Sequence, residues 1–278
     1  MFEDKTIAFV GSGIMAEAMI KGLLRQGLVL PGQIVASGPR RERAQELFDR
    51  YQVRTTTDNV EAVRGADLVV LAVKPQVLGA VLEELNGAVD PETLMLSIVA
   101  GAPLATIQKL GAAAVVRVMP NTPAQIGMGI SVWTASEATT EAQRQEALAI
   151  LTALGEEVYV GDEGYLDMAT ALSGTGPAYV FLLMEAMVDA GVHLGFSRHV
   201  SERLVIATLR GSVEYARQSP RHLAALRNQV TSPGGTSAEA IYHLEKGGLR
   251  TVLSRAIWAA YQRSRALGGR ARERDADG

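Results

Sequence analysis

The sequence predicts an α/β fold, with an N-terminal Rossmann-type, doubly wound, mostly parallel sheet followed by an all-helical C-terminal domain. As far as about Val160, short runs of Val, Ile and Leu alternate with helical patterns. Such near-continuous apolar strands, separated by helices, indicate a parallel sheet buried on both faces. The loop "GSGIMA", Gly11–Ala16, follows the first run and opens a helix. After "GDEG", Gly161–Gly164, only helical patterns remain.

The apolar runs of the first half define the predicted strands, and the last two extend the sheet beyond its nucleotide-binding half. They are residues 6–11, 33–37, 67–73, 93–99, 114–120, 129–133 and 157–161. The predicted helices of the second half are Tyr165–Leu172, Pro177–Leu194, Arg198–Gln218, Arg221–Asn228, Thr236–Lys246 and Gly248–Leu267. We therefore expect an NAD(P)-binding domain at 1–160, a helical domain at 161–268 and a disordered charged tail at 269–278.

Composition narrows the function classes. The 278 residues are 47% hydrophobic and 21% charged, and the formal net charge of -3 gives no electrostatic reason for nucleic acid as a partner. The absence of cysteine excludes disulfides and thiolate chemistry, and no histidine and carboxylate spacing predicts a metal site.

Location and membrane contact are also predicted from the chain. The N-terminus lacks the basic start and long apolar run of a signal peptide, so a cytoplasmic location is expected. The most apolar segment, Gly176–Gly195, carries Glu185, Asp189 and His193 at four-residue spacing. This polar stripe argues for a buried helix and against a membrane span.

The first glycine-rich loop predicts a dinucleotide site. Gly11 would form the tight turn, and Gly13 would let the backbone approach a pyrophosphate, while Ala16 replaces the third glycine. The phosphates would lie on free amides where the helix begins near Ile14, which makes Ser12 and Met15 further candidates. An ordinary tight turn between strand and helix is the alternative.

The turn after the second predicted strand indicates which dinucleotide binds. Its sequence, "VASGPRRER", lacks the acid that usually holds the ribose hydroxyls of NAD. Ser37, Arg40 and Arg41 would instead meet a 2′-phosphate, so NADPH is preferred and NADH stays possible. Solvated arginines at a helix start are the alternative.

Two further segments end strands at the carboxyl edge of the sheet, where such folds bind ligands. The first is "AVKPQ", whose candidate cofactor contacts are Ala72, Val73, Lys74 and Pro75. The second is "MPNTP", in which Asn121 and Thr122 could position a small polar molecule or the nicotinamide amide. A rigid turn between two prolines is the alternative for this segment.

A second glycine-rich loop, "VTSPGGTSAEAI", lies in the helical half at 230–241. Free amides at a helix start beside hydroxyls favour an anion such as a carboxylate. A structural N-cap is the alternative. The stretch "SGTGPAYV", which begins at Ser173, also separates two helices and suits either close packing or a nearby ligand.

In order along the chain, "GSGIMA", "AVKPQ", "MPNTP", "ALSGTGPAY" and "VTSPGGTSAEAI" resemble the pyrroline-5-carboxylate reductase family from about Ile7 to Leu267. The resemblance implies reduction of the ring imine of 1-pyrroline-5-carboxylate to L-proline, the last step of proline biosynthesis. It also implies a homodimer formed by the helical domain, with larger rings, such as a decamer of dimers, built from it. The substrate-binding residues would be Thr231, Ser232, Gly234, Gly235, Thr236, Ser237 and Ser173.

The resemblance further implies a catalytic role for Ser237, near the ring nitrogen. Many members of the family have threonine there, so this chain keeps the hydroxyl but loses the methyl group that restricts its rotamer. No histidine is needed, because hydride transfer to an imine depends mainly on binding and orientation.

Two other functions fit part of the pattern. A β-hydroxyacid dehydrogenase or another imine reductase would share the first loop, but those dehydrogenases usually rely on a lysine in the helical domain. Lys246, the only lysine after Gly161, stands at a helix end as a capping residue would. A non-catalytic NADP-binding regulatory protein would not need the second loop.

Overall fold

The computed structural model describes residues 2–269. The chain forms two compact units: one contains the described residues up to Gly176 together with those from Ala260 on, and the other is Pro177–Ala259. The predicted domain boundaries stay predictions, and the tail expected at 269–278 lies, apart from Gly269, outside the described residues.

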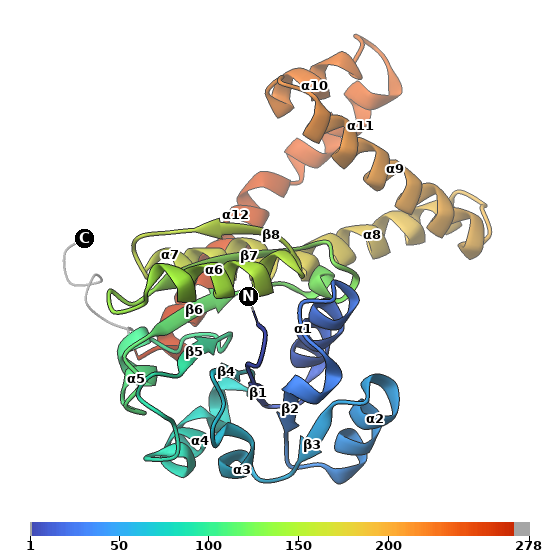
Figure 1. Ribbon diagram of the computed structural model, residues 1–278. Coiled ribbons are helices and arrows are strands. Elements are labelled where there is room, and N and C mark those ends of the chain that lie inside the picture. The colour runs from blue at the N-terminus through green and yellow to red at the C-terminus, as the bar shows by residue number, and fades with distance from the viewer. Residues whose placement is uncertain (1, 270–278) are drawn as a thin grey trace, which may run out of the picture. The chain divides into compact units, whose positions relative to one another are not determined.

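The first unit is built on an eight-stranded sheet with the order β3-β2-β1-β4-β5-β6-β7-β8 (Figure 1). The strands are β1 (Ile7–Val10), β2 (Ile34–Ser37), β3 (Arg54–Thr56), β4 (Leu68–Leu71), β5 (Leu94–Ser97), β6 (Val115–Met119), β7 (Gly129–Ala135) and β8 (Gly155–Tyr159). Every neighbouring pair is parallel except β6 and β7. The predicted Rossmann-type, mostly parallel fold is confirmed.

Helices cover both faces of this sheet. They are α1 (Ile14–Arg25), α2 (Arg41–Tyr51), α3 (Asn59–Val63), α4 (Leu78–Leu85), α5 (Leu104–Gln108), α6 (Glu141–Thr152) and α7 (Tyr165–Ala169). Phe9 of β1 packs in one buried cluster with Met19 of α1, and the next residue, Val10, packs in a second with Leu85 of α4. Successive strand residues point to opposite faces, so the sheet has an apolar core on each side.

Two details of the sheet differ from a simple parallel pattern. β3, which the sequence analysis missed, has only three polar residues and pairs with β2 at the edge of the sheet. β7 runs antiparallel because only the short 3-10 helix η3 (Thr122–Ile126) separates it from β6. A parallel connection would need a crossover of about a dozen residues.

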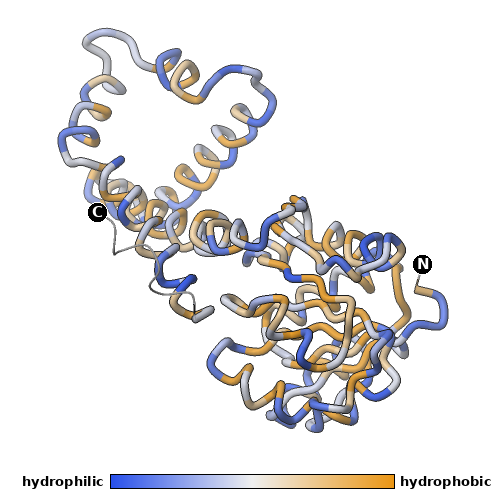
Figure 2. Tube along the Cα trace, turned by 90° about the vertical axis from the view of Figure 1, so that its left-hand side faces the viewer, coloured by the Kyte–Doolittle hydropathy of each residue, from blue (hydrophilic) through white to orange (hydrophobic). Residues whose placement is uncertain are grey.

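The second unit is helical. It contains α8 (Gly176–His193), α9 (Arg198–Gln218), α10 (Leu223–Gln229), α11 (Thr236–Lys246) and the beginning of α12 (Leu249–Leu267). Within Pro177–Ala259 the buried side chains are Val188, Ser201 and Val205. Apolar and polar residues alternate along these helices, whereas apolar residues gather along the strands of the first unit (Figure 2).

The predicted helix at 165–172 continues in a different geometry. α7 is followed by a π-helical turn, η4 (Thr170–Gly174), before α8 begins. Together they form a described stretch, Tyr165–His193, that is long and apolar enough to cross a membrane by length and composition alone. Arg198 at the start of α9 forms a 2.8 Å ion pair with Asp189 of α8.

Candidate active site

A cleft of about 760 Å³ lies at the carboxyl ends of the central strands. It is lined by Gly13, Ile14, Met15, Glu17, Arg40, Glu42, Arg43, Glu46, Ala72, Val73, Lys74, Pro75, Ile98, Ala100, Met119, Pro120, Asn121, Thr122 and Gly174. The strand order reverses between β1 and β4, and open α/β sheets bind ligands at such a switch point.

The loop between β1 and α1 has the geometry that a dinucleotide requires. Gly11 has φ +101°, and a Cβ atom there would lie 2.7 Å from the carbonyl carbon of Ala72. Gly13 faces open space and is the N-cap of α1, without a side-chain cap bond. The amides of the first turn are therefore accessible to an anion, which fits the pyrophosphate of a dinucleotide.

The turn after β2 presents two arginines. Arg40 is the N-cap of α2 and lines the cleft, and Arg41 begins the helix. Both side chains are exposed, and among the described residues neither forms an ion pair. The predicted partner Ser37 is fully buried, and its hydroxyl donates to Asn59 Oδ1 at 2.7 Å. Any cofactor contact by that hydroxyl would compete with Asn59.

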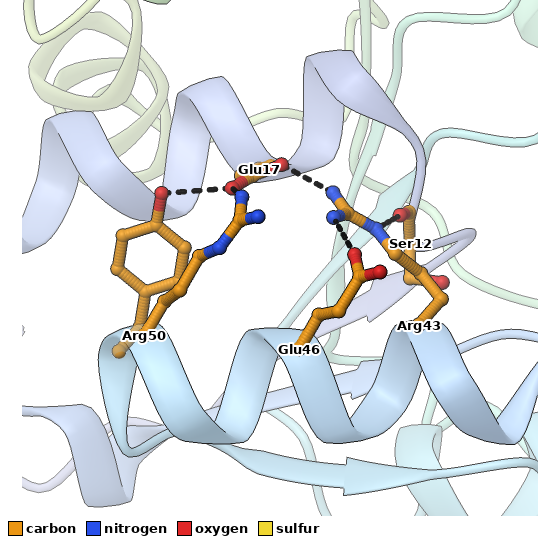
Figure 3. Close-up of polar contacts among 6 residues, drawn as sticks. Ser12, Glu17, Arg43, Glu46 and Arg50 are labelled. Atoms are coloured by element: carbon orange, nitrogen blue, oxygen red, sulfur yellow. Dashed lines mark hydrogen bonds and ion pairs between the residues drawn. The ribbon is translucent and has the colours of Figure 1, made fainter.

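A charged cluster joins α1 to α2 beside this turn (Figure 3). Arg43 Nε donates to the carbonyl oxygen of Ser12 at 2.9 Å, Nη1 donates to Glu46 at 2.8 Å, and Nη2 donates to Glu17. Glu17 also accepts hydrogen bonds from Arg50 Nη1 at 3.0 Å and from the Tyr51 hydroxyl at 2.9 Å.

The cluster changes the pKa values of its members. Burial opposes ionisation of Glu17, but the bonds from Arg43, Tyr51 and Arg50 outweigh burial and hold the pKa of Glu17 below its ordinary value of 4.5. Burial likewise opposes the charge on Arg43, yet bonds to Glu17 and Glu46 raise its pKa. Burial and the carboxylate of Glu17 raise the pKa of Tyr51. The cluster is therefore a salt bridge in its charged form at neutral pH.

Asn121 also lines the cleft, in the segment that follows β6. Its Nδ2 donates to the carbonyl oxygen of Ser173 at 3.2 Å, and its Oδ1 accepts from the amide of Ile130 at 3.0 Å. The Ser173 hydroxyl donates to the carbonyl oxygen of Ala169 at 3.0 Å. Asn121 thus ties η4 to β7 through one N–H and the oxygen of its side-chain amide.

The second glycine-rich loop joins α10 to α11 in the helical unit. Gly234 has φ +70°, a left-handed conformation that favours glycine, and a Cβ atom on Gly235 would lie 2.6 Å from Ser232 Oγ, so a side chain there would displace that hydroxyl. Gly235 is the N-cap of α11, with no side-chain cap bond.

The hydroxyls of this loop differ in their contacts. Thr231 Oγ1 donates to the carbonyl oxygen of Arg227 at 2.7 Å. In the described part of the chain, no protein group holds the hydroxyls of Ser232, Thr236 and Ser237. These hydroxyls, with the open amides of the α11 first turn, could receive a carboxylate.

The predicted cofactor residues divide into two sets. Those that line the cleft are Gly13, Ile14, Met15, Arg40, Ala72, Val73, Lys74, Pro75 and Asn121; those outside its lining are Gly11, Ser12, Ser37 and Arg41. Ser173 lies next to the cleft through its bond to Asn121, and the predicted loop residues Thr231, Ser232, Gly234, Gly235, Thr236 and Ser237 lie together in the helical unit.

The sequence analysis missed the acids Glu17, Glu42 and Glu46 and the arginine Arg43 at the cleft. One feature of the sequence could have indicated the contact between Glu17 and Arg43. Glu17 and Arg43 lie in the first turns of helices that follow neighbouring strands, so their side chains can meet across adjacent helices.

Comparison with known proteins covers both units. A family model described as pyrroline-5-carboxylate reductase dimerisation matches residues 163–267, and one described as NADP oxidoreductase, coenzyme F420-dependent, matches residues 6–101. The chain is 43% identical to pyrroline-5-carboxylate reductase of Pseudomonas aeruginosa, over 94% of this chain and 96% of that protein. The corresponding enzyme of Synechocystis sp. is 40% identical, over 94% of this chain and 98% of that protein.

Solved structures give the same result. The structure of Plasmodium falciparum pyrroline carboxylate reductase with NADP bound is 30% identical, with a TM-score of 0.88 and coverage of 96% of this chain and 99% of that chain. The enzyme of Coxiella burnetii is 36% identical, with a TM-score of 0.84 over 95% and 98% of the two chains. The similarity therefore extends over nearly the full length of the sequence and of the fold.

Proposed function

The chain belongs to the pyrroline-5-carboxylate reductase family, and on that premise we propose that it reduces the ring imine of 1-pyrroline-5-carboxylate to L-proline with NADPH, as the last step of proline biosynthesis. The observation that carries the proposal is the presence, in one chain, of two glycine-rich loops of different chemistry. One borders the cleft at the switch point of the sheet, and the other precedes a helix whose neighbouring hydroxyls, those of Ser232, Thr236 and Ser237, have no protein partner among the described residues.

The cofactor would bind along the cleft of the first unit. Its nicotinamide, when bound, supplies the hydride. The open first turn of α1 fits the pyrophosphate, and the backbone of Ala72–Pro75 would border the cofactor at the end of β4. Arg40 and Arg41 support a preference for NADPH, because both are exposed cations without ion-pair partners in the described residues.

The carboxylate of the substrate would lie on the second loop. The amides at the start of α11 and the hydroxyls of Ser232 and Thr236 would hold it, and this contact would orient the ring. Ser173 belongs to this proposal through its carbonyl, which Asn121 holds beside the cleft.

Ser237 would act at the ring nitrogen. Reduction of the imine adds the cofactor's hydride to the carbon of the C=N bond and a proton to the nitrogen, so the C=N bond becomes a C–N bond with one new C–H and one new N–H. The Ser237 hydroxyl, without a protein partner in the described residues, would hydrogen-bond to that nitrogen and fix its position during the transfer.

The assembly is proposed on similar grounds. The matched dimerisation model and the apolar exposed helices of the second unit support a homodimer through that unit. Larger rings such as a decamer of dimers, and a cytoplasmic location, stay proposals. In the proposed reaction the small-molecule substrate is 1-pyrroline-5-carboxylate, which reacts with the bound cofactor.

The first experiment measures NADPH oxidation by the purified protein with 1-pyrroline-5-carboxylate and identifies the product. Ser237→Ala should lower kcat on the order of a hundredfold with little change in NADPH affinity, because it removes one hydrogen-bonding group at the reacting atom. Ser237→Thr, which restores the hydroxyl, should recover most of the activity. Equal kcat in wild type and Ser237→Ala at saturating substrate would remove Ser237 from the mechanism. A wild-type protein that binds NADPH yet forms no proline would refute the proposed function.

A further inference from the structure

Arg43 makes three contacts with one guanidinium group, and two of them reach the first glycine-rich loop or the helix that follows it. Its Nε donates to the Ser12 carbonyl oxygen at 2.9 Å, and its Nη2 pairs with Glu17 in the first turn of α1. The side chains of Arg43 and Glu17 are 12% and 17% exposed. Such a forked, largely buried arrangement holds its partners in a defined geometry.

The contact with Ser12 determines where the next amide points. All described peptide bonds are trans, so the carbonyl of Ser12 and the N–H of Gly13 point in opposite directions. Arg43 holds that carbonyl from the α2 side (Figure 3). The Gly13 amide is therefore turned away from Arg43, at the residue through which this type of loop approaches a pyrophosphate.

The charge of Arg43 is balanced by its neighbours. Two carboxylates, Glu17 and Glu46, pair with its guanidinium, whereas Arg40 and Arg41 have no ion-pair partner among the described residues. A cation that already serves two acids adds little attraction for the 2′-phosphate of a cofactor. The three arginines of "RRER" thus divide into two cations without an ion-pair partner among the described residues, Arg40 and Arg41, and one engaged cation, Arg43.

We propose that Arg43, held by Glu17, is a positioning residue that orients the Ser12–Gly13 peptide for the cofactor's pyrophosphate and takes no part in distinguishing NADPH from NADH. This inference rests on the proposed cofactor site. It assigns phosphate-loop geometry to Arg43 and leaves 2′-phosphate recognition to Arg40 and Arg41.

The test measures equilibrium binding of NADPH and of NADH separately by titration calorimetry, without the imine substrate. Arg43→Lys keeps the charge but cannot supply the three-pronged contact, so the Kd of both cofactors should rise by the same factor, on the order of tenfold for the loss of one charge-assisted hydrogen bond. The Arg40→Gln, Arg41→Gln double variant should weaken NADPH binding far more than NADH binding.

A matched control is available on helix α6. Arg144 of α6 also donates to a backbone carbonyl, that of Ser136, at 3.4 Å, and does not line the cleft. Arg144→Lys should leave both Kd values unchanged. If Arg43→Lys folds poorly, as shown by a large fall in Tm, Glu17→Gln provides the second variant, and it too should weaken both cofactors equally.

Two results would overturn the proposal. Selective loss of NADPH binding in Arg43→Lys would show that Arg43 contacts the 2′-phosphate, and unchanged Kd values with a lowered Tm would show that the cluster only stabilises the fold. Because binding is measured without turnover, a failure of imine reduction would count against the proposed function and not against this assignment.

Discussion

The two compact units bury their apolar side chains to very different extents. In the first unit, strand residues such as Ile7 and Phe9 are fully buried, and so are Met19 and Leu23 of α1. In the second, Phe181 and Leu182 of α8 are 61% and 67% exposed. The first unit therefore completes its hydrophobic core within one chain, whereas the second leaves large apolar side chains in contact with solvent.

Large exposed apolar side chains also occur on the other helices of the second unit. Trp258 of α12 and Val213 of α9 are also exposed, at 59% and 67%. Helices at a dimer interface show this pattern when each chain is considered alone, because obligate interfaces resemble a core divided between two chains. The matched dimerisation model covers these helices, which supports a second copy as the covering partner.

The largest expected effect comes from a charge placed on the exposed apolar surface of α8. Leu182→Glu should abolish the proposed dimer at micromolar concentration, because burial of an unpaired carboxylate in an apolar interface costs several kcal/mol. Light scattering coupled to size-exclusion chromatography gives the mass directly. A variant that stays dimeric would place Leu182 outside the interface.

The chain offers a matched control in the other unit. Leu30 is 72% exposed and precedes the 3-10 helix η1 (Pro31–Gln33). Leu30→Glu introduces the same charge at an equally exposed leucine, and it should leave the mass unchanged. Dissociation by both variants would show that the loss of the dimer reflects general destabilisation, and the contrast between the units would fail.

Buried charge in the first unit gives the next largest effect. The side chain of Arg117 on β6 is 4% exposed, and its Nη1 lies 2.9 Å from Glu163 Oε1. Its Nη2 lies 3.6 Å from Asp167 Oδ1, which also accepts a 2.8 Å bond from Ser264 near the end of α12. Arg117→Met should lower the free energy of unfolding by about 3–5 kcal/mol, because Asp167 stays buried without its arginine. Urea denaturation measures this change.

The comparison variant for this pair lies in the helical unit. Asp189 and Arg198 form an ion pair at 2.8 Å, but their side chains are 57% and 62% exposed. Asp189→Asn should change the free energy of unfolding by less than about 1 kcal/mol, because solvent screens the exposed pair. A similar loss in both variants would mean that Asp189 is buried in the assembled protein.

Sequence patterns predicted features that depend on local chemistry. β1 and β4 were predictable because they are continuous apolar runs, and α11 because glycines and hydroxyls precede its apolar face. β3 was not, since its residues Arg54–Thr56 become a strand only by pairing with the edge of β2. The hydrogen bond of the Ser37 hydroxyl was not predictable either, because its acceptor, Asn59, is distant in sequence.

The same limit applies to the site. The Gly11–Met15 loop follows from its own residues, but the role of Arg43 depends on how α2 packs beside α1. Spacing along the sequence does not give the distance between side chains on α1 and α2, so the contact between Glu17 and Arg43 was not predicted. The amide of Asn121 shows the converse: its position at the cleft was predictable, but its bonds to Ser173 and Ile130 were not.

A smaller effect than that of Arg117→Met is expected at the Glu17 cluster, and it depends on pH. The pKa of Glu17 in the folded protein lies below its ordinary value of 4.5, because bonds from Arg43, Tyr51 and Arg50 outweigh the effect of burial. A lowered folded pKa means that the ionised group stabilises the fold above pH 4.5, and this contribution is lost as the pH falls through the folded pKa. Glu17→Gln should therefore cost about 1–2 kcal/mol at pH 7 and progressively less below pH 4.5.

An exposed glutamate in the helical unit sharpens this last test. Hydrogen bonds from Arg217 and Gln218 lower the pKa of Glu214 to about 2, yet its carboxylate is solvated. A lowered pKa at an exposed site reflects contacts that water and salt compete for, so Glu214→Gln should leave Tm unchanged at every pH. Thermal unfolding of both variants between pH 3 and pH 7, at one protein concentration, separates the two cases. A pH-independent loss in Glu17→Gln would show that its hydrogen-bond geometry, and not its charge, stabilises the pairing of α1 with α2.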